Sequence, residues 1–379
     1  MFLALREIAR AKVRFALLSG AIGLLVFLIT FQQGLFGGLI TGFIGAVENQ
    51  NAEILVFNDQ ARRNVEGSFL FPQQAEEIAA VSGVAATGPI GQNTFTVIVQ
   101  PGDTPVDEDA VIFGYELGGL GEPTTLSEGR LPEGPGEAVA SAVDADDGFD
   151  IGDRVEVVAD GAAEVITVVG LAENIQWSVA PTLFVSFDTY AAARLAVNPD
   201  ASVVLPSLIG VAAEPGVEAD ELTARIDDAV DGVEALTRQQ AADDNPGVQG
   251  VSQSGSIILG LAFLVVTLVV AFFFLILTTQ KTASLTLLRA IGAPARYLVW
   301  GILAQIVVVT SLGVAMGVAL TVLVEQAVRS AIPIDVEART VAITVAALLV
   351  LALLGGLVSV RRVLQLDPIR ATTAAGRTS

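Results

Sequence analysis

The stretch Ser256-IILGLAFLVVTLVVAFFFLILTT-Gln280 decides the fold of this chain. It contains no charged side chain, and its only polar residues between the two ends are three threonines. A helix needs about 20 apolar residues to cross the hydrocarbon core of a bilayer. The stretch is long enough, so it predicts a transmembrane helix over residues 251–279.

Further uncharged runs cover residues 15–47, 297–324 and 340–360. Each is bounded by arginine or glutamate, as expected where a helix leaves the hydrocarbon and charged side chains reach water. The first run has 33 residues, whereas the apolar core of a cleaved signal peptide has about 7 to 15. We therefore expect a retained helix there, and an α-helical polytopic membrane protein with four transmembrane helices.

The charged residues are unevenly distributed along the chain. The formal net charge is -21, but residues 1–47, 280–296 and 360–379 together carry +9 and the rest carries -30. A surplus of arginine and lysine in alternate loops marks the cytoplasmic segments of a membrane protein. The pattern predicts a multi-pass protein of the plasma membrane whose two termini are both cytoplasmic.

This topology gives each segment between the spans a side of the membrane. Arg6, Arg10 and Arg14 recur at every fourth position, so residues 1–14 are predicted to form an interfacial helix on the lipid of the cytoplasmic leaflet. The other segments follow by alternation: a cytoplasmic segment at 280–296, a cytoplasmic tail at 361–379, an extracytoplasmic domain at 48–250 and an extracytoplasmic loop at 325–339.

Glycines recur at every fourth position late in the first span. Gly34, Gly38 and Gly42 form two overlapping GxxxG motifs, which allow a neighbouring helix to approach closely in a membrane. We expect these three residues to form a helix-packing seam, of which a dimer interface is one form.

Cysteine and histidine are absent, and lysine occurs only at positions 12 and 281. Disulfides, metal sites built on cysteine or histidine, and Ser-His-Asp triads are therefore excluded. Neither lysine follows a glycine-rich loop, so the chain has no Walker A site for ATP. We expect no enzyme activity, no bound cofactor or metal and no nucleic-acid partner, with ATP and magnesium held by a separate ATPase subunit.

Residues 48–250 mix strand-like runs, helical patterns and turns rich in glycine and proline, which predicts an α+β domain. The expected strands are 53–57, 94–99, 110–113, 154–158, 165–169 and 183–187, and the expected helices are 72–81, 188–196 and 217–230.

An acidic cluster at Asp144, Asp146, Asp147, Asp150 and Asp153 leaves a calcium site as an alternative to a solvated surface. An EF-hand loop has acidic residues at positions 1, 3 and 5 and a glutamate at position 12. Counted from Asp144, position 5 is a glycine and position 12 is a valine. The loop does not match, so we expect a solvated acidic surface.

Short motifs along nearly the whole chain carry a family resemblance. Gln280-KTASLTLLRAIGA-Pro294 follows the second span, and Val360-RRVLQLDPIR-Ala371 follows the last. The domain adds Leu126-SEG-Arg130, Gly136-EA-Val139, Asp150-IGDR-Val155 and Ile166-TVV-Gly170. In their order and spacing these motifs resemble the FtsX/MacB-type permeases of ABC transporters, in which one helix, a MacB-like periplasmic domain and three helices follow one another.

The resemblance implies a permease that works as a dimer, here expected to be a homodimer, with two copies of an ABC ATPase. In such permeases, closure of the ATPases pulls on the cytoplasmic segment after the second span, and that span passes the movement to the outer domain. The resemblance assigns ATPase coupling to Lys281, Leu285, Leu288, Arg289 and Gly292.

A narrower likeness points to the Hrt-type haem-efflux permeases, and DevC-type exporters share part of it. It rests on Asn245-Pro-Gly247, Thr279-Gln-Lys281, Tyr297-Leu298 and Gln305. This likeness implies that haem is a transported cargo and not a resident cofactor.

Haem iron is usually bound by His, Cys, Met or Tyr. Glu48, at the end of the first span, is the first candidate ligand here because a twofold dimer presents two copies of it, with Phe43, Ile44 and Val47 facing the porphyrin. Met316 and Tyr297 are weaker candidates, since Met316 is expected to be buried in the third span and Tyr297 to lie at its cytoplasmic end. A Glu48 that only marks the membrane boundary is the alternative.

The sequence leaves three functions open. The first is export of an amphipathic cargo, with haem as the leading candidate and a lipid or lipoprotein as the alternative. The second is FtsX-like mechanical signalling, in which nothing crosses the membrane and cell-wall hydrolases are controlled. The third is a membrane-anchored adhesion or sensor protein without an ATPase, whose function would not depend on residues 280–296.

Overall fold

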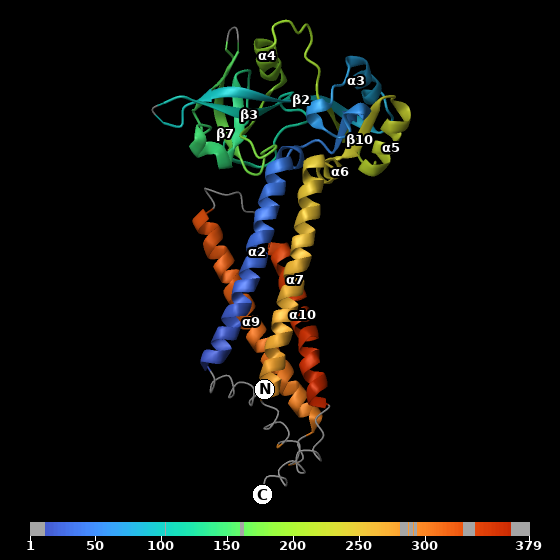
Figure 1. Cartoon of the computed structure of the whole chain (residues 1–379). Coiled ribbons are helices and arrows are strands. Elements are labelled where there is room, and N and C mark those ends of the chain that lie inside the picture. Colours follow the sequence, from blue (N-terminus) through green and yellow to red (C-terminus); the bar gives the residue numbers. More distant parts are fainter. Residues whose placement is uncertain are drawn as a thin grey trace. The chain divides into compact units, whose positions relative to one another are not determined.

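The computed structural model describes residues 12–102, 104–159, 163–280, 287, 291, 294–328 and 338–364. The chain forms two compact units. The first holds the residues up to Gly37 and from Ser254 onward, and the second holds Gly38–Gln253. Helices α2 (Lys12–Glu48) and α7 (Pro246–Gln280) belong in part to each unit (Figure 1).

The described part of the first unit is a bundle of α2, α7, α9 (Ala295–Val328) and α10 (Ala338–Leu364). Each helix places apolar side chains in a common core at the spacing of one helical face. The core residues are Phe15, Leu18, Ile22, Val26 and Ile29 of α2, Val266, Val270 and Phe274 of α7, Ile306, Val309 and Val314 of α9, and Leu348 and Ala352 of α10. Large apolar side chains such as Leu28, Leu261 and Phe272 are exposed on the outside, which is typical of helices in lipid.

Within the described residues, three helical stretches are long and apolar enough to cross a membrane: Lys12–Glu48, Pro246–Ile276 and Arg296–Ala327. The described apolar part of α10 is the shorter Ala338–Leu354, although the helix itself has 27 residues. Three predicted spans are therefore supported, and the fourth stays a prediction.

The described part of the second unit is built on a ten-stranded mixed sheet flanked by short helices (Figure 1). Nine strands follow the order β10-β1-β9-β2-β3-β8-β5-β7-β4, and β6 pairs with both β2 and β7. The prediction of an α+β domain is confirmed. The strands are β1 (Ile54–Asn58), β2 (Val84–Val99), β3 (Val106–Tyr115), β4 (Leu126–Gly129), β5 (Glu137–Ser141), β6 (Arg154–Val157), β7 (Val165–Ala172), β8 (Thr182–Ser186), β9 (Leu208–Ala213) and β10 (Val233–Thr237), and the helices are α3 (Pro72–Ala79), α4 (Phe187–Val197), α5 (Ala219–Ala229) and α6 (Arg238–Asp243).

Two parts of this sheet have cores of their own. β1 pairs antiparallel with β9 on one side and with β10 on the other, and α3 and α5 cover one face of these strands, with Ile54, Val56 and Leu222 buried between the layers. β2, β3, β8, β5, β7 and β6 pair in a closed ring. Side chains such as Phe95 and Val97 form the core of that ring.

Candidate functional site

The C-terminal end of α2 is buried in the core of the second unit. Ile44, Ala46 and Val47 are 1%, 1% and 3% exposed. They pack with Leu55 and Phe57, which lie on the face of β1 opposite to the face covered by α3 and α5. Full burial of a valine or isoleucine side chain stabilises a protein by about 1.5–3 kcal/mol. The last turns of α2 are thus part of the domain and not a linker to it.

A loop over residues 174–180 is hydrogen-bonded to the same end of α2. The contact is made by the main chain on both sides, so it does not depend on side-chain rotamers. The bonds run from Val179 N to Gly42 O at 2.7 Å, from Ser178 N to Phe43 O at 3.1 Å and from Ala46 N to Gln176 O at 3.0 Å.

Glycine is required at position 45, where this loop touches α2. A Cβ atom on Gly45 would lie 2.3 Å from the carbonyl oxygen of Asn174, a main-chain atom that cannot rotate away. A Cβ atom on Gly42 would lie 3.4 Å from a valine side chain of the loop. Within this chain Gly42 contacts the loop, and its place in a helix-packing seam stays a prediction.

A buried carboxyl group holds the loop onto the ring of strands. Asp144 lies in the 3-10 helix η3 (Ala142–Asp147) directly after β5 and is 7% exposed. Its two oxygens accept hydrogen bonds from Nε2 of Gln176 at 2.8 and 3.0 Å. Burial raises the pKa of Asp144 to about 6, and the hydrogen bonds from Gln176 oppose that rise. Gln176 thus connects α2, through its main chain, with η3, through its side chain.

Helix α7 begins in the same core, next to the end of α2. Oδ1 of Asn245 accepts a hydrogen bond from Gly247 N at 2.9 Å, which caps the first turn of the helix. Val248 is 4% exposed and belongs to the core that also holds Val47. A Cβ atom on Gly247 would lie 3.3 Å from the ring of Phe43, so the two helix ends are in direct contact.

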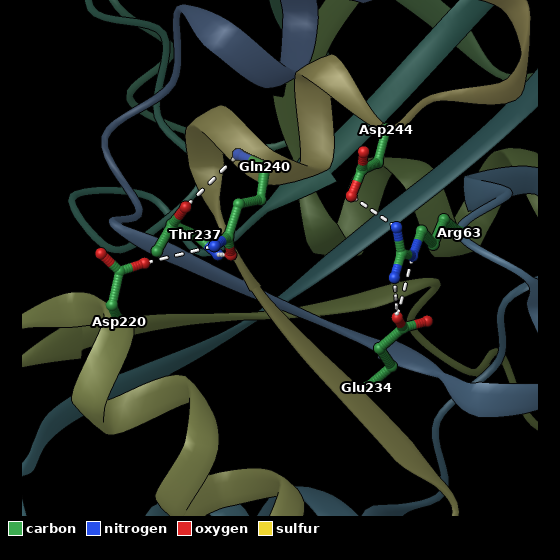
Figure 2. Close-up of polar contacts among 6 residues, drawn as sticks. All are labelled: Arg63, Asp220, Glu234, Thr237, Gln240 and Asp244. Carbon is green, nitrogen blue, oxygen red and sulfur yellow. Dashed lines mark hydrogen bonds and ion pairs between the residues drawn. The ribbon is translucent and has the colours of Figure 1, made fainter. Parts of the chain in front are cut away.

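Polar contacts hold the segment before α7 onto the sheet. Arg63 donates from Nε to Glu234 of β10 at 2.8 Å and forms an ion pair with Asp244, directly after α6. Gln240 and Thr237 form a capping box at the start of α6. Because α6 leads directly into α7, these contacts fix the point at which the chain leaves the domain. Figure 2 shows the residues involved: Arg63, Asp220, Glu234, Thr237, Gln240 and Asp244.

In the first unit, α2 and α9 cross at glycines of both helices. A Cβ atom on Gly317 would lie 2.6 Å from Gly23 O, and one on Gly313 would lie 2.7 Å from a side chain of α2. The hydroxyl groups of Thr30 and Thr321 are 2.5 Å apart across the same pair of helices. Gly313 and Gly317 form a GxxxG motif that the sequence-based prediction missed, although its signal was the same as that of Gly34 and Gly38.

An apolar groove of about 370 Å³ lies between α2 and α7 in the first unit. Pockets for small molecules usually measure about 300–1,000 Å³, so the groove is large enough for part of a lipid or porphyrin. Gln32 is its only polar lining residue among those described, and the rest are Leu25, Leu28, Ile29, Phe31, Leu35, Ala262, Val265 and Val266.

The predicted haem-site residues fall in both units. Glu48 is exposed at the last position of α2, and Phe43 is partly buried against the core of the second unit. Val47 is 3% exposed, so its side chain is not open to a ligand in this chain. Met316 of α9 is 54% exposed, so the expectation that it is buried is wrong. Tyr297 is 51% exposed.

Other predicted sites lie partly or wholly outside the described residues. Lys281, Leu285, Leu288, Arg289 and Gly292, predicted to couple to the ATPase, are outside them, as is most of the predicted interfacial helix over residues 1–14. Gly34 and Gly38 are buried in α2, and their place in a helix-packing seam stays a prediction.

The acidic cluster after β5 does not converge on one point. No group of three acidic side chains placed to hold a metal ion occurs among the described residues. Asp144 is buried on Gln176, which contradicts its place in a solvated surface. The carboxylate of Asp153 accepts a hydrogen bond from Asp150 N at 2.9 Å, which is a local turn contact.

Two protein-family models match the chain. Residues 15–229 match the MacB-like periplasmic core domain, and residues 256–368 match the C-terminal region of FtsX-like permeases. The matches cover parts of both units, and residues 230–255, where α7 begins, lie between them.

Whole-length relatives are similar at low identity. An uncharacterized ABC transporter permease of Mycobacterium tuberculosis is 26% identical over 373 residues, which is 98% of this chain and 99% of the relative. The putative hemin transport system permease protein HrtB of Staphylococcus haemolyticus is 22% identical over 378 residues, with the same two coverages of 98% and 99%. The periplasmic region of MacB from Actinobacillus actinomycetemcomitans, a crystal structure, matches with a TM-score of 0.35 and 15% identity, covering 52% of this chain and 92% of that chain.

Proposed function

Because this chain belongs to the FtsX/MacB-type family of ABC transporter permeases, we propose that it couples ATP hydrolysis by a partner ATPase to export of an amphipathic cargo, haem foremost. The observation that carries the coupling is that α2 ends and α7 begins side by side in one core of the second unit. We call this arrangement the junction. Movement of either helix then acts directly on the sheet. The choice of haem rests on the whole-length similarity to a putative hemin transport permease.

The proposed drive comes from the cytoplasmic side. Two ATPase copies act on two permease copies in a homodimer, through Lys281, Leu285, Leu288, Arg289 and Gly292. Helix α7 starts at Pro246 and continues without a further proline to Gln280, and a helix without an internal proline resists kinking. The proposal includes four spans, with α10 as the fourth, in the plasma membrane with both termini cytoplasmic. The chain itself carries no catalytic step.

The proposed cargo path begins in the membrane. The groove between α2 and α7 is lined almost entirely by apolar side chains, which suits a molecule that partitions into lipid before it is exported. Glu48 is the proposed iron ligand, paired with its copy in the second protomer. Of the three porphyrin-facing candidates, Phe43 is retained and Ile44 and Val47 are not, because both are buried. Met316, being exposed, stays a weaker candidate.

The experiment is a haem titration of the purified permease in detergent, followed by visible absorption. Wild type is compared with Glu48→Ala and with Glu66→Ala, which removes another exposed carboxylate of the same domain. We expect saturable binding that Glu48→Ala weakens and Glu66→Ala leaves unchanged. Absence of saturable binding in all three proteins would reject haem as the cargo and leave the permease assignment untouched.

Mechanical signalling is the second candidate function, and the same junction favours it, because nothing in the junction requires a cargo. The two candidates differ in one measurement. Proteoliposomes that hold permease and ATPase should move haem in an ATP-dependent way under the first proposal and should not under the second.

Adhesion or sensing without an ATPase is tested on the cytoplasmic segment. Under either transporter proposal, Leu285→Asp with Leu288→Asp should abolish co-purification of the ATPase. Full cellular function in that double variant would leave only the third class.

A further inference from the structure

Two phenylalanines of the second unit are exposed to solvent. Of the nine between residues 38 and 253, only Phe69 and Phe71 are exposed, at 41% and 58%. Leu70 between them is fully buried, and its N–H donates to Pro206 O at 3.0 Å. The alternation of an extended segment therefore turns both rings outward. Val203, on the neighbouring segment, is 63% exposed.

A pocket of about 160 Å³ opens beside these residues. Phe69, Val203 and Leu205 contribute apolar walls, and Arg194 and Asn198 contribute polar ones. The volume is about half the lower limit of usual small-molecule pockets, which is about 300 Å³. The pocket is therefore sized for one side chain or one chain end and not for a whole cofactor.

Arg194, at the end of α4, is partly buried. Its main-chain oxygen accepts a hydrogen bond from Asn198 N, but its guanidinium group has no hydrogen-bond or ion-pair partner among the described residues. The unit carries 36 acidic residues against seven arginines, so carboxylates are plentiful, yet none is placed on this guanidinium. The other partly buried arginines of the unit are paired: Arg63 with Glu234 and Asp244, Arg225 with Glu221, and Arg238 with the main-chain oxygen of Gln50.

We propose that the surface formed by Phe69, Phe71, Val203 and Arg194 binds a polypeptide that presents a carboxylate next to an apolar side chain. A guanidinium binds a carboxylate through two parallel hydrogen bonds. The apolar side chain fills the pocket, and the two exposed rings supply the surrounding contact that aromatic residues give at protein interfaces. A hydrophobic chain end with a free terminal carboxylate meets all three requirements.

This docking surface goes beyond the proposed function, since neither ATP coupling nor haem binding uses its residues. It belongs to the domain proposed to lie outside the membrane, so the partner is an extracytoplasmic protein. The 36 acidic residues of the unit repel a chain that is acidic along its length, so we expect a partner whose negative charge is confined to the carboxylate that meets Arg194.

The test uses the full-length permease in detergent with ¹⁵N-labelled arginine side chains. N-acetyl-leucine is the probe, because it joins one carboxylate to one apolar side chain, and neutral N-acetyl-leucinamide is the control ligand. The Nε–H signal of Arg194, assigned by its loss in Arg194→Gln, should shift saturably with the acid and not with the amide. Val203→Asp keeps the Arg194 signal but adds a negative charge that repels the carboxylate of the ligand. It should weaken binding about tenfold.

Arg154→Gln is the matched control variant, because Arg154 is an exposed arginine of the same unit outside the pocket. It should leave the titration unchanged. The proposal is overturned if the amide shifts the Arg194 signal as strongly as the acid does, or if the acid produces no saturable shift at millimolar concentration. Unchanged binding in Val203→Asp would also overturn it.

Discussion

Helix α2 relies on glycine in two places, and the two contacts differ in what lies opposite. In the first unit Gly23 meets Gly313 and Gly317, so a helix packs on a helix. In the second unit Gly45 meets the carbonyl of Asn174, so a helix packs on the main chain of a loop that is also hydrogen-bonded to it. Two helices can separate by a few tenths of an ångström, whereas a hydrogen-bonded loop cannot. We infer that α2 is held more rigidly at its C-terminal end.

The largest effect is expected at the loop contact. Gly45→Ala places a Cβ atom 2.3 Å from a main-chain oxygen, so we expect the domain to lose more than about 3 kcal/mol of unfolding free energy. Gly20→Ala on the same helix is the control: a Cβ there meets nothing within 4 Å, and alanine favours a helix by about 1 kcal/mol over glycine. Thermal unfolding in detergent measures the stability of both variants. Equal melting temperatures for Gly45→Ala and Gly20→Ala would refute the rigid contact at Gly45.

The next effect concerns the carboxyl group that supports the loop. The pKa of Asp144 is raised from 3.8 to about 6 by burial, so the folded protein binds this proton more tightly than the unfolded chain. The group therefore stabilises the domain fully below pH 4, and that stabilisation is lost as the pH rises through about 6. The free energy of unfolding falls by at most about 3 kcal/mol over this pH range. Asp144→Asn removes this pH dependence.

The measurement is urea unfolding of wild type and Asp144→Asn at several pH values. The stability of the variant relative to wild type should increase by up to about 3 kcal/mol between pH 4 and pH 7. Asp146→Asn, which changes an exposed neighbour in η3, should show no such trend. If the difference in unfolding free energy between Asp144→Asn and wild type stays constant across this pH range, the pKa of Asp144 is not raised in the folded protein.

A smaller effect is expected where helix meets helix. Gly317→Ala places a Cβ atom 2.6 Å from Gly23 O, but α9 can move away from α2, so we expect a loss of about 2 kcal/mol. The control is Gly301→Ala on α9, where nothing lies within 4 Å of the new atom. A loss for Gly317→Ala as large as that for Gly45→Ala, by thermal unfolding in detergent, would remove the difference between the two contacts.

The smallest effect is expected for the hydroxyl pair across α2 and α9. Thr30 and Thr321 are 2.5 Å apart, and interhelical hydrogen bonds in membranes average about 0.6 kcal/mol. A double-mutant cycle with Thr30→Val and Thr321→Val should return a coupling energy of that size. A coupling above about 2 kcal/mol would mean that this crossing, too, is rigidly fixed.

Local patterns predicted the elements that have clear periodicity. All six expected strands and all three expected helices of the domain occur, and except at the start of β2 their ends are displaced by at most a few residues. The first half of β2 was missed because Gly88, Pro89 and Gly91 indicate a turn. In the structure a Cβ atom on Gly91 would lie 2.2 Å from the ring of Tyr190, so this glycine serves a close approach within a strand.

The contacts at the junction could not be predicted from the sequence. Gly42 stood out because it repeats with Gly34 and Gly38, whereas Gly45 lies outside that repeat and has the closer contact. The link from Asp144 to Gln176 joins residues 32 positions apart, and no local pattern announces it. What periodicity reveals is which residues share a face of one element, and the junction depends on contacts between elements.

The order of strands has a consequence for how this domain is made. β1 pairs only with β9 and β10 among the described strands, and its partner for Val56 in β9 is Ile209. About 150 residues must be synthesised after β1 before its first strand partner, β9, is available, which takes roughly 8 to 30 seconds at usual translation rates. During that time the side chains of β1 can pack on α2 and α3, but its main-chain N–H and C=O groups have no strand to pair with. The edge groups of β1 therefore find their strand partners only when most of the domain has been made.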